Sequence, residues 1–315
     1  MNIYRIIILM GFSTMNILTS QNELPCVHDQ LNSDSITLFS HGLLDSGRSQ
    51  ISGYTLNEVS PDTQATQPAF LPRHTISKPY AYFNFDDACE PTYGIKLFKF
   101  WHLSFGQHND IEKLFRAYNA TVQKFPTRHL VLAGVSRGSS VILSFVAAYQ
   151  PKNIKALVLE SPFDRIQTSL QAAAEHVPSL INFGLTRAVA KFILANIAFK
   201  YKIDALQPID VVYKIPLNMP ILIVCSLEDK LVPAYSSYHL YEALRARGHK
   251  HAYILVLEKG KHAKLLHGQS GEQYEYVVHA FYKKYGLKHD PSLAEKGEPL
   301  LKLCQPNGPL TVRQP

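Results

Sequence analysis

A serine stands between two glycines in the segment GVSRG, residues 134–138, where one apolar run gives way to another. The spacing matches G-x-S-x-G, and it lies between an expected strand and an expected helix. A turn this tight leaves no room for side chains two residues before and after the serine, and Gly134 and Gly138 remove them. The hydroxyl of Ser136 would then project from the carboxyl edge of a sheet, at a helix N-terminus that favours developing negative charge. The pattern predicts a serine nucleophile rather than a glycine-rich turn without chemistry.

Four segments, taken in order, resemble the α/β-hydrolase superfamily: FSHGLL, GVSRG, SLEDKLVP and KGKHA. The similarity covers roughly residues 35–286 and is nearest to the serine-aminopeptidase-like and prolyl-oligopeptidase-like hydrolases, of which LESPF and MPILIVCSLEDKLVP are also typical. The resemblance implies an α/β fold with a mostly parallel central sheet that is flanked by helices and carries an inserted helical cap.

A serine hydroxyl becomes a good nucleophile when a histidine, held in one tautomer by a carboxylate, takes its proton. In the family that this sequence resembles, the acid follows the serine and the histidine comes last. Asp229 is the expected acid because it follows the apolar run PILIVC and so lies at the same sheet edge as Ser136. Its neighbour Glu228 should point elsewhere, and Glu160, which also ends an expected strand, is the alternative acid.

The sequence contains 14 histidines, so position along the chain must select the base. His262 is the expected base because it follows the last expected strand, in the loop GKHAKL before the last expected helix. His267 would serve only if that loop ran differently. His249 and His251 precede the strand and therefore lie at the opposite edge of the sheet.

Attack on a carbonyl produces an oxyanion that preorganised donors must stabilise. The resemblance places these donors at the backbone N–H of Arg137, directly after the serine, and of Leu43, in the loop after LFSHG. Gly42 would let this loop pass close to the substrate, and His41 is expected to support the loop rather than to do chemistry. We expect the side chain of Arg137 to lie along the helix surface. Many relatives have a longer glycine run where this sequence has HGLLDSG.

Strand-like and helix-like segments alternate along the chain, which indicates a parallel sheet with crossover helices. Asn109 is expected to cap the first long helix, with Glu112 completing a capping-box-like start. The expected strands span residues 35–42, 79–85, 128–135, 154–161, 219–226 and 252–260, and the expected helices span 109–125, 140–150, 235–248 and 272–286.

From about residue 164 to 212 the sequence carries only helical patterns, and a block of this size between two strands predicts an inserted cap. The chain then divides into an N-terminal segment (1–20), a hydrolase domain (21–289) and a proline-rich tail (290–315) that we expect to lie loosely.

The chain has 315 residues, of which 46% are hydrophobic and 18% charged, enough for a full core and too apolar for broad disorder. The formal charge is +7, but the lysines and arginines are scattered and no nucleic-acid signature is present. Residues 1–20 combine Arg5 with a short apolar run interrupted by polar residues, which is shorter than the about 20 residues of a membrane span. We expect a cleaved secretory signal and a secreted or periplasmic protein, with an uncleaved membrane anchor as the alternative.

The four cysteines allow at most one disulfide if Cys225, in the apolar run PILIVCS, is a free buried thiol. The pairing among Cys26, Cys89 and Cys304 in an oxidising compartment stays open. The sequence has no C-x-x-C pair and no Cys/His zinc spacing, so we expect no metal site and no cofactor.

These features predict a serine hydrolase that cleaves a carboxylic ester, thioester or amide through an acyl-enzyme. A serine peptidase of the aminopeptidase or prolyl-oligopeptidase type must anchor an α-amine or a proline ring, often through cap carboxylates. The expected cap holds few acids, which favours a carboxylesterase-like activity; these are Asp164, Glu175, Asp204 and Asp210. The expected partner is a small-molecule or peptide substrate, and the oligomeric state stays open. An alternative of another class is a non-catalytic binding protein on a hydrolase scaffold.

Overall fold

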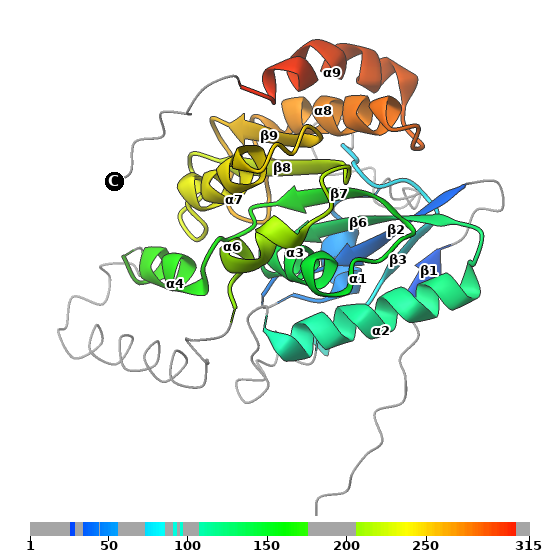
Figure 1. Ribbon diagram of the computed structural model, residues 1–315. Helices are drawn as coiled ribbons and strands as arrows, with labels where there is room; N and C mark the ends of the chain where they lie inside the picture. The colour runs from blue at the N-terminus through cyan, green and yellow to red at the C-terminus, as the bar shows by residue number, and fades with distance from the viewer. Residues whose placement is uncertain are drawn as a thin grey trace, which may run out of the picture.

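The computed structural model describes residues 26–28, 34–43, 45–55, 73–85, 91–92, 95–96, 107–175 and 206–306. Within these residues, seven strands form a central sheet in the order β1-β3-β2-β6-β7-β8-β9 (Figure 1). Strands β3, β2, β6, β7, β8 and β9 run parallel to one another, and β1 pairs antiparallel with β3 at the edge. Their bounds are β1 Cys26–His28, β2 Ser35–Ser40, β3 Tyr80–Tyr82, β6 His129–Val135, β7 Ile154–Glu160, β8 Ile221–Ser226 and β9 Ala252–Leu257. A separate two-stranded pair consists of β4 Pro91–Thr92 and β5 Ile95–Lys96.

The central strands are continuous apolar runs because both faces of the sheet are covered by helices. Alternate residues of a strand therefore enter two different cores. Leu130 and Leu132 of β6 pack into one apolar cluster, whereas Val131 and Ala133 pack into the other. This pattern confirms the predicted α/β fold with a mostly parallel sheet flanked by helices.

Helices α2, α3 and α7 pack on one face of the sheet, and α1, α8 and α9 pack on the other (Figure 1). The crossover helices bring the chain back to the starting edge after each strand, so the carboxyl ends of the strands collect at one rim. The helix bounds are α1 Gly47–Ile51, α2 His108–Lys124, α3 Arg137–Tyr149, α4 Ile166–Glu175, α6 Pro208–Val211, α7 Ala234–Ala246, α8 Gly271–Lys284 and α9 Pro291–Leu303, with a 3-10 turn η4 at Val212–Lys214.

Two helix starts differ from the expectation. Helix α2 begins at His108 with Gln107 at its cap position, so Asn109 lies inside the first turn and does not cap the helix. Helix α3 begins at Arg137 rather than near residue 140, because Ser136 itself occupies the cap position. Both corrections concern the residue at which a helix starts, where local propensity competes with the turn that precedes it.

The prediction of a loose C-terminal tail is wrong for residues 291–303, which form helix α9 and pack along α8 (Figure 1). Prolines suggested irregular chain, but Pro291 stands in the first turn, where its missing N–H costs nothing. The Asp290 carboxylate caps this helix by accepting from the N–H groups of Ser292 and Leu293. Directly after α9, the carbonyl of Cys304 accepts from the N–H of Ile254 at 2.8 Å, so the end of this helix is fastened to edge strand β9.

The two ends of the expected cap, residues 164–165 and 209–210, contact each other. The Asp210 carboxylate pairs with both terminal nitrogens of the Arg165 guanidinium, at 2.6 and 3.2 Å, and the N–H of Ile209 donates to the Asp164 carbonyl. Residues 176–205 lie outside the described residues, and so does most of the predicted cap. The expected signal segment, residues 1–20, also lies outside them, and export therefore stays a prediction. In the part of the chain that the structure describes, no helix is long and apolar enough to cross a membrane.

The described cysteine side chains are reduced. Cys225 is a free, fully buried thiol, as predicted. Cys304 is also free, and its Sγ donates to the carbonyl of Leu300. The side chain of Cys26 and all of Cys89 lie outside the described residues, so a bridge between those two is untested.

Candidate active site

Ser136 occupies the sharp turn between β6 and α3. Its backbone φ is 54°, a value that residues other than glycine rarely adopt. A Cβ at position 134 would lie 2.8 Å from the backbone of residues 138 and 139, at the start of α3. A Cβ at position 138 would lie 2.0 Å from the carbonyl oxygen of Ser40, at the end of β2. The two glycines are therefore required by the close approach of strand and helix around the serine.

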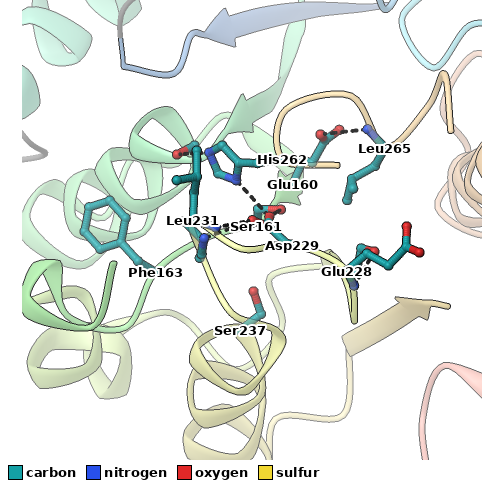
Figure 2. A network of polar contacts seen from close by, with 12 residues as sticks. Glu160, Ser161, Phe163, Glu228, Asp229, Leu231, Ser237, His262 and Leu265 are labelled. Atoms are coloured by element: carbon teal, nitrogen blue, oxygen red, sulfur yellow. Dashed lines mark hydrogen bonds and ion pairs between the residues drawn. The ribbon is translucent and has the colours of Figure 1, made fainter. Parts of the chain in front are cut away.

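The structure brings Ser136, Asp229 and His262 together at the carboxyl rim of the sheet, from three different loops. Nε2 of His262 lies 2.9 Å from Oγ of Ser136. Nδ1 of the same ring lies 2.8 Å from Oδ2 of Asp229 (Figure 2). With the Nδ1 proton directed at the carboxylate, Nε2 presents its lone pair to the serine hydroxyl. This chain of hydrogen bonds can move the serine proton to the imidazole as a carbonyl is attacked.

The Asp229 carboxylate is buried but surrounded by four donors. Oδ1 accepts from the backbone N–H groups of Leu231 at 3.0 Å and Val232 at 2.9 Å. Oδ2 accepts from His262 and from the hydroxyl of Ser161 at 2.9 Å. These bonds replace those to water that a buried carboxylate loses, and so offset the cost of burying it.

The loop after β2 passes directly beside the serine, since a Cβ built at Gly42 would lie 3.6 Å from Cβ of Ser136. The N–H of Gly42 donates to Oε1 of Gln50 at 2.7 Å, so this group is already engaged. The next N–H along the loop belongs to Leu43, the expected oxyanion donor. The oxyanion roles of the N–H groups of Leu43 and Arg137 stay a prediction.

His41 supports this loop. Its Nε2 accepts from the N–H of Phe85 at 3.0 Å, so the proton is on Nδ1, which donates to the carbonyl of Gly42 at 2.7 Å. Burial, with the Arg137 charge nearby, lowers the pKa of His41 to about 3. The ring therefore stays neutral and holds the loop by hydrogen bonds.

The side chain of Arg137 does not lie along the helix surface, and that expectation is wrong. It is 2% exposed, stacks over the Phe85 ring with the guanidinium carbon 4.2 Å from the ring centre, and donates to the Gly42 carbonyl at 3.3 Å. Nη1 lies 3.9 Å from the carboxylate of Asp110, which is equally buried on α2. The side chain turns inward because it finds two buried partners there, the carboxylate of Asp110 and the ring of Phe85. Neither partner is close to Arg137 in the sequence.

The alternative acid, Glu160, lies behind the histidine loop. Its carboxylate accepts from the hydroxyl of Tyr54 at 2.8 Å and, at a longer 3.5 Å, from the N–H of Leu265. Burial raises the pKa of Glu160 to about 7. Glu228 also points away from the imidazole and accepts from the N–H of Gly260 (Figure 2). Of the candidate acids, Asp229 is the one that accepts from His262.

The other histidines considered lie elsewhere. Nε2 of His267 lies beside Gly53, 3.1 Å from where a Cβ on that glycine would be. His249 contacts the carbonyl of Pro216, and His251 contacts the hydroxyl of Tyr285, at the end of the sheet where β9 begins.

Sequence reasoning missed two residues that hold the site. Ser161 was present in the quoted segment LESPF, and its place directly after β7 at the same sheet edge could have identified it. Gln50 has no local signal, because its contact with Gly42 arises from the fold of the loop and α1.

One group within the described residues could offer three metal ligands: His74, Glu275 and His279. Nδ1 of His279 accepts from the N–H of Asp290, so Nε2 carries the proton and donates to the carbonyl of His74. Both ring nitrogens are therefore engaged within the protein. We interpret the group as a structural network that fastens residues 73–76 to α8.

The sequence model of the prolyl oligopeptidase family matches residues 80–288. No curated protein matches the chain. Among solved structures, an esterase of Pyrococcus furiosus superposes with a TM-score of 0.55 at 13% identity, covering 82% of this chain and 91% of that one. An acylaminoacyl peptidase of Pyrococcus horikoshii superposes with a TM-score of 0.53 at 18% identity, covering 84% of this chain and 39% of the longer peptidase. The esterase and the peptidase share the fold of this chain. The predicted relationship to the α/β-hydrolase superfamily is confirmed, and the chain belongs to the prolyl oligopeptidase family as a serine hydrolase.

Proposed function

We propose that this serine hydrolase is carboxylesterase-like and works through Ser136, His262 and Asp229. The observation that carries the proposal is the unbroken hydrogen-bond chain from Oγ of Ser136 through the imidazole to Oδ2 of Asp229. All three side chains converge on the rim where the loops after β6, β8 and β9 meet.

The reaction begins when Oγ of Ser136 attacks the substrate carbonyl and its proton passes to Nε2 of His262. The N–H groups of Leu43 and Arg137 stabilise the oxyanion of the tetrahedral intermediate. His262 then returns the proton to the leaving alcohol, and an acyl-enzyme forms on Ser136. Water attacks this ester in turn, with His262 again taking and returning the proton, and releases the acid.

The acids of the expected cap support an ester substrate rather than a peptide that is bound through its free α-amine. Of the four cap acids, two have described side chains, and both are engaged: Asp164 with Ser236 and His239, and Asp210 with Arg165. Neither is available to bind a substrate amine without breaking an existing pair.

An apolar cluster also adjoins the expected oxyanion loop. Leu43 packs against a cluster that includes Phe163 and Val232, which belong to the loops after β7 and β8. A wall of this kind suits an apolar acyl or alcohol group, because its burial releases water from apolar surface on both partners.

A serine peptidase is the second candidate, and membership in the prolyl oligopeptidase family favours it. The acylaminoacyl peptidase that shares this fold adds no support, because this chain covers only 39% of it and the activity of the longer protein cannot be assigned to this chain.

Turnover of p-nitrophenyl acetate, butyrate and octanoate, compared with aminoacyl and acylaminoacyl p-nitroanilides, tests the choice. We expect turnover of the esters, loss of all turnover in Ser136→Ala, and loss of fluorophosphonate labelling in the same variant. Cleavage of the anilides without ester turnover would reverse the order of the two candidates. Equal labelling of the native protein and Ser136→Ala would remove Ser136 from the mechanism.

A further inference from the structure

Ser161 stands directly after β7, is fully buried, and donates its hydroxyl to Oδ2 of Asp229 at 2.9 Å. Figure 2 shows it beside Asp229, underneath the His262 ring. Its backbone φ is 46°, a left-handed conformation that residues with a side chain rarely adopt because it is strained. A strained, buried serine that contacts the candidate catalytic acid calls for a physical reason.

The hydroxyl bonds the same carboxylate oxygen that accepts from Nδ1 of His262. The other oxygen is held by two backbone N–H groups, those of Leu231 and Val232. Without the Ser161 hydroxyl, the imidazole alone would hold Oδ2, and the last torsion angle of the carboxylate, whose energy profile is broad, would be less tightly restrained. The serine therefore adds a restraint on the plane of the carboxylate that does not depend on the histidine.

The main chain around Ser161 is held firmly enough to sustain its strain. The N–H of Ser161 donates to the carbonyl of Val224 on β8 at 2.7 Å. One residue earlier, the carbonyl of Glu160 accepts from the N–H of Ser136, also at 2.7 Å, and from the hydroxyl of Ser139 at 2.9 Å. The same short turn thus anchors the backbone of the candidate nucleophile and the side chain of the candidate acid, so their relative position is set by one rigid segment.

We propose that Ser161 is a positioning residue for the hydrolytic reaction: its hydroxyl orients the Asp229 carboxylate toward His262 and shares the carboxylate's charge. The inference rests on the proposed function, because it assigns Asp229 and His262 their catalytic roles. Sharing the charge weakens the pull of the carboxylate on the imidazole proton. Loss of the hydroxyl should therefore hold the imidazole protonated to higher pH and move the acidic limb of the kcat/KM profile upward.

Other titratable groups face this pair from the neighbouring strands. Glu160, on β7, is tied to Tyr54 and Leu265, and the buried Cys225 thiol lies on β8. Burial raises the pKa of Cys225 above its usual range. Both groups are retained in the variants below, so a change in the profile reports on the hydroxyl.

Three variants separate the hydroxyl from the backbone strain. Ser161→Ala removes the hydroxyl and keeps the strained φ, whereas Ser161→Gly removes the hydroxyl and relieves the strain. Ser237→Ala is the matched control, since Ser237 is a buried serine whose hydroxyl donates to the carbonyl of Pro162 instead (Figure 2). For each, kcat, KM and their pH dependence are measured on a p-nitrophenyl ester, together with stability in urea.

We expect kcat to fall about 10-fold in both Ser161 variants, with KM within about twofold, as the loss of one hydrogen bond to a charged group implies. The acidic limb should move to higher pH in both, although Ser161→Gly should be the more stable protein. Ser237→Ala should keep kcat within about twofold, because its hydroxyl is not bonded to the carboxylate.

Unchanged kcat and an unmoved acidic limb in Ser161→Ala and Ser161→Gly would overturn the proposal. Recovery of kcat in the glycine variant alone would also overturn it, because activity would then follow strain rather than the hydroxyl. If Ser161→Ala does not fold, Ser161→Gly still gives the decisive comparison, since glycine accepts the φ. Loss of turnover in Ser136→Ala combined with normal Ser161 variants would reject the role of Ser161 alone. Persisting turnover in Ser136→Ala would reject the proposed function, and the role of Ser161 with it.

Discussion

At the scale of single residues, hydrogen-bond direction decides what each group in the site can do. The Phe85 N–H fixes the tautomer of His41, and the Asp229 carboxylate orients His262. Two carboxylates lie within reach of the histidine loop, but their surroundings differ. Asp229 is met by four donors, whereas burial raises the pKa of Glu160 to about 7. The two acids therefore differ in role: Asp229 is held by donors that include His262, whereas Glu160 can hold a proton near neutrality.

The variants Asp229→Asn and Glu160→Gln test this difference on activity. Asn can no longer hold the imidazole in the required tautomer, so we expect kcat to fall by about 10³- to 10⁴-fold. Glu160→Gln keeps an acceptor for Tyr54 and leaves the hydrogen bonds of His262 in place, so kcat should stay within about tenfold of the native value. Steady-state kinetics on a p-nitrophenyl ester gives both numbers, and the reverse ranking would make Glu160 the working acid.

At the scale of elements, close approaches of backbone set where glycine is required. Around Ser136 they join β2, β6 and α3 into the tight turn of the site. A second such contact joins α9 to α8, where a Cβ at Gly297 would lie 1.9 Å from the carbonyl oxygen of Tyr276. Helix α9 also buries Leu301 in the core, so this terminal helix is part of the folded domain.

Gly297→Ala should therefore destabilise the protein by at least about 2 kcal/mol, because the two helices must move apart and lose packing. Gly248→Ala is a suitable comparison: its φ is 81° but a Cβ there meets nothing within 4 Å. We expect the comparison to cost about 1 kcal/mol, from backbone strain alone. Urea unfolding measures both, and equal losses would show that α9 does not pack tightly on α8.

At the scale of the whole molecule, buried titratable groups set the pH range in which the fold is stable. Burial, as the main cause, lowers the pKa of His41 to about 3 and those of His249 and His279 to about 4. These rings are neutral in the folded protein, whereas in the unfolded chain each takes up a proton below about pH 6.5. Their contribution to stability is thus fully present above pH 6.5 and is lost as pH falls toward 4. Glu160 acts in the opposite sense, since its raised pKa makes stability fall as pH rises from about 4.5 to about 7.

His249→Gln provides a test of the acid effect, because Gln can still donate to the carbonyl of Pro216. As the pH falls from 6.5 to 4, the free energy of unfolding of the native protein should decrease. This histidine should contribute up to about 1.4 kcal/mol of that decrease per pH unit. The variant should lose correspondingly less over the same range. His129→Gln, at an exposed position, should match the native slope. Parallel curves for the native protein and His249→Gln would contradict the assignment of a buried neutral ring.

The strand positions were predictable from sequence because each is a short apolar run bounded by glycine, proline or polar residues. For the same reason, the places of Ser136, Asp229 and His262 at strand ends followed from the order of those runs. The start of α2 was not predictable in this way, since Asn109 and Gln107 are both plausible at a helix start. Helix α9 was missed because its prolines suggest irregular chain. Pro291 stands in the first turn, and the helix, with Pro299 inside it, is held by its packing on α8.

By itself, the amino-acid sequence determined the alternation of strands and helices, the sharp turn at Ser136 and the sheet edge at which the acid and the histidine emerge. These depend on neighbours in sequence: apolar periodicity, glycine spacing and the order of loops. Only the tertiary structure decided that Arg137 turns inward to Asp110, that Gln50 holds Gly42 and that Ser161 holds Asp229. Each of these contacts joins residues that belong to different elements or loops, and each is stable because burial makes an unmatched polar group costly.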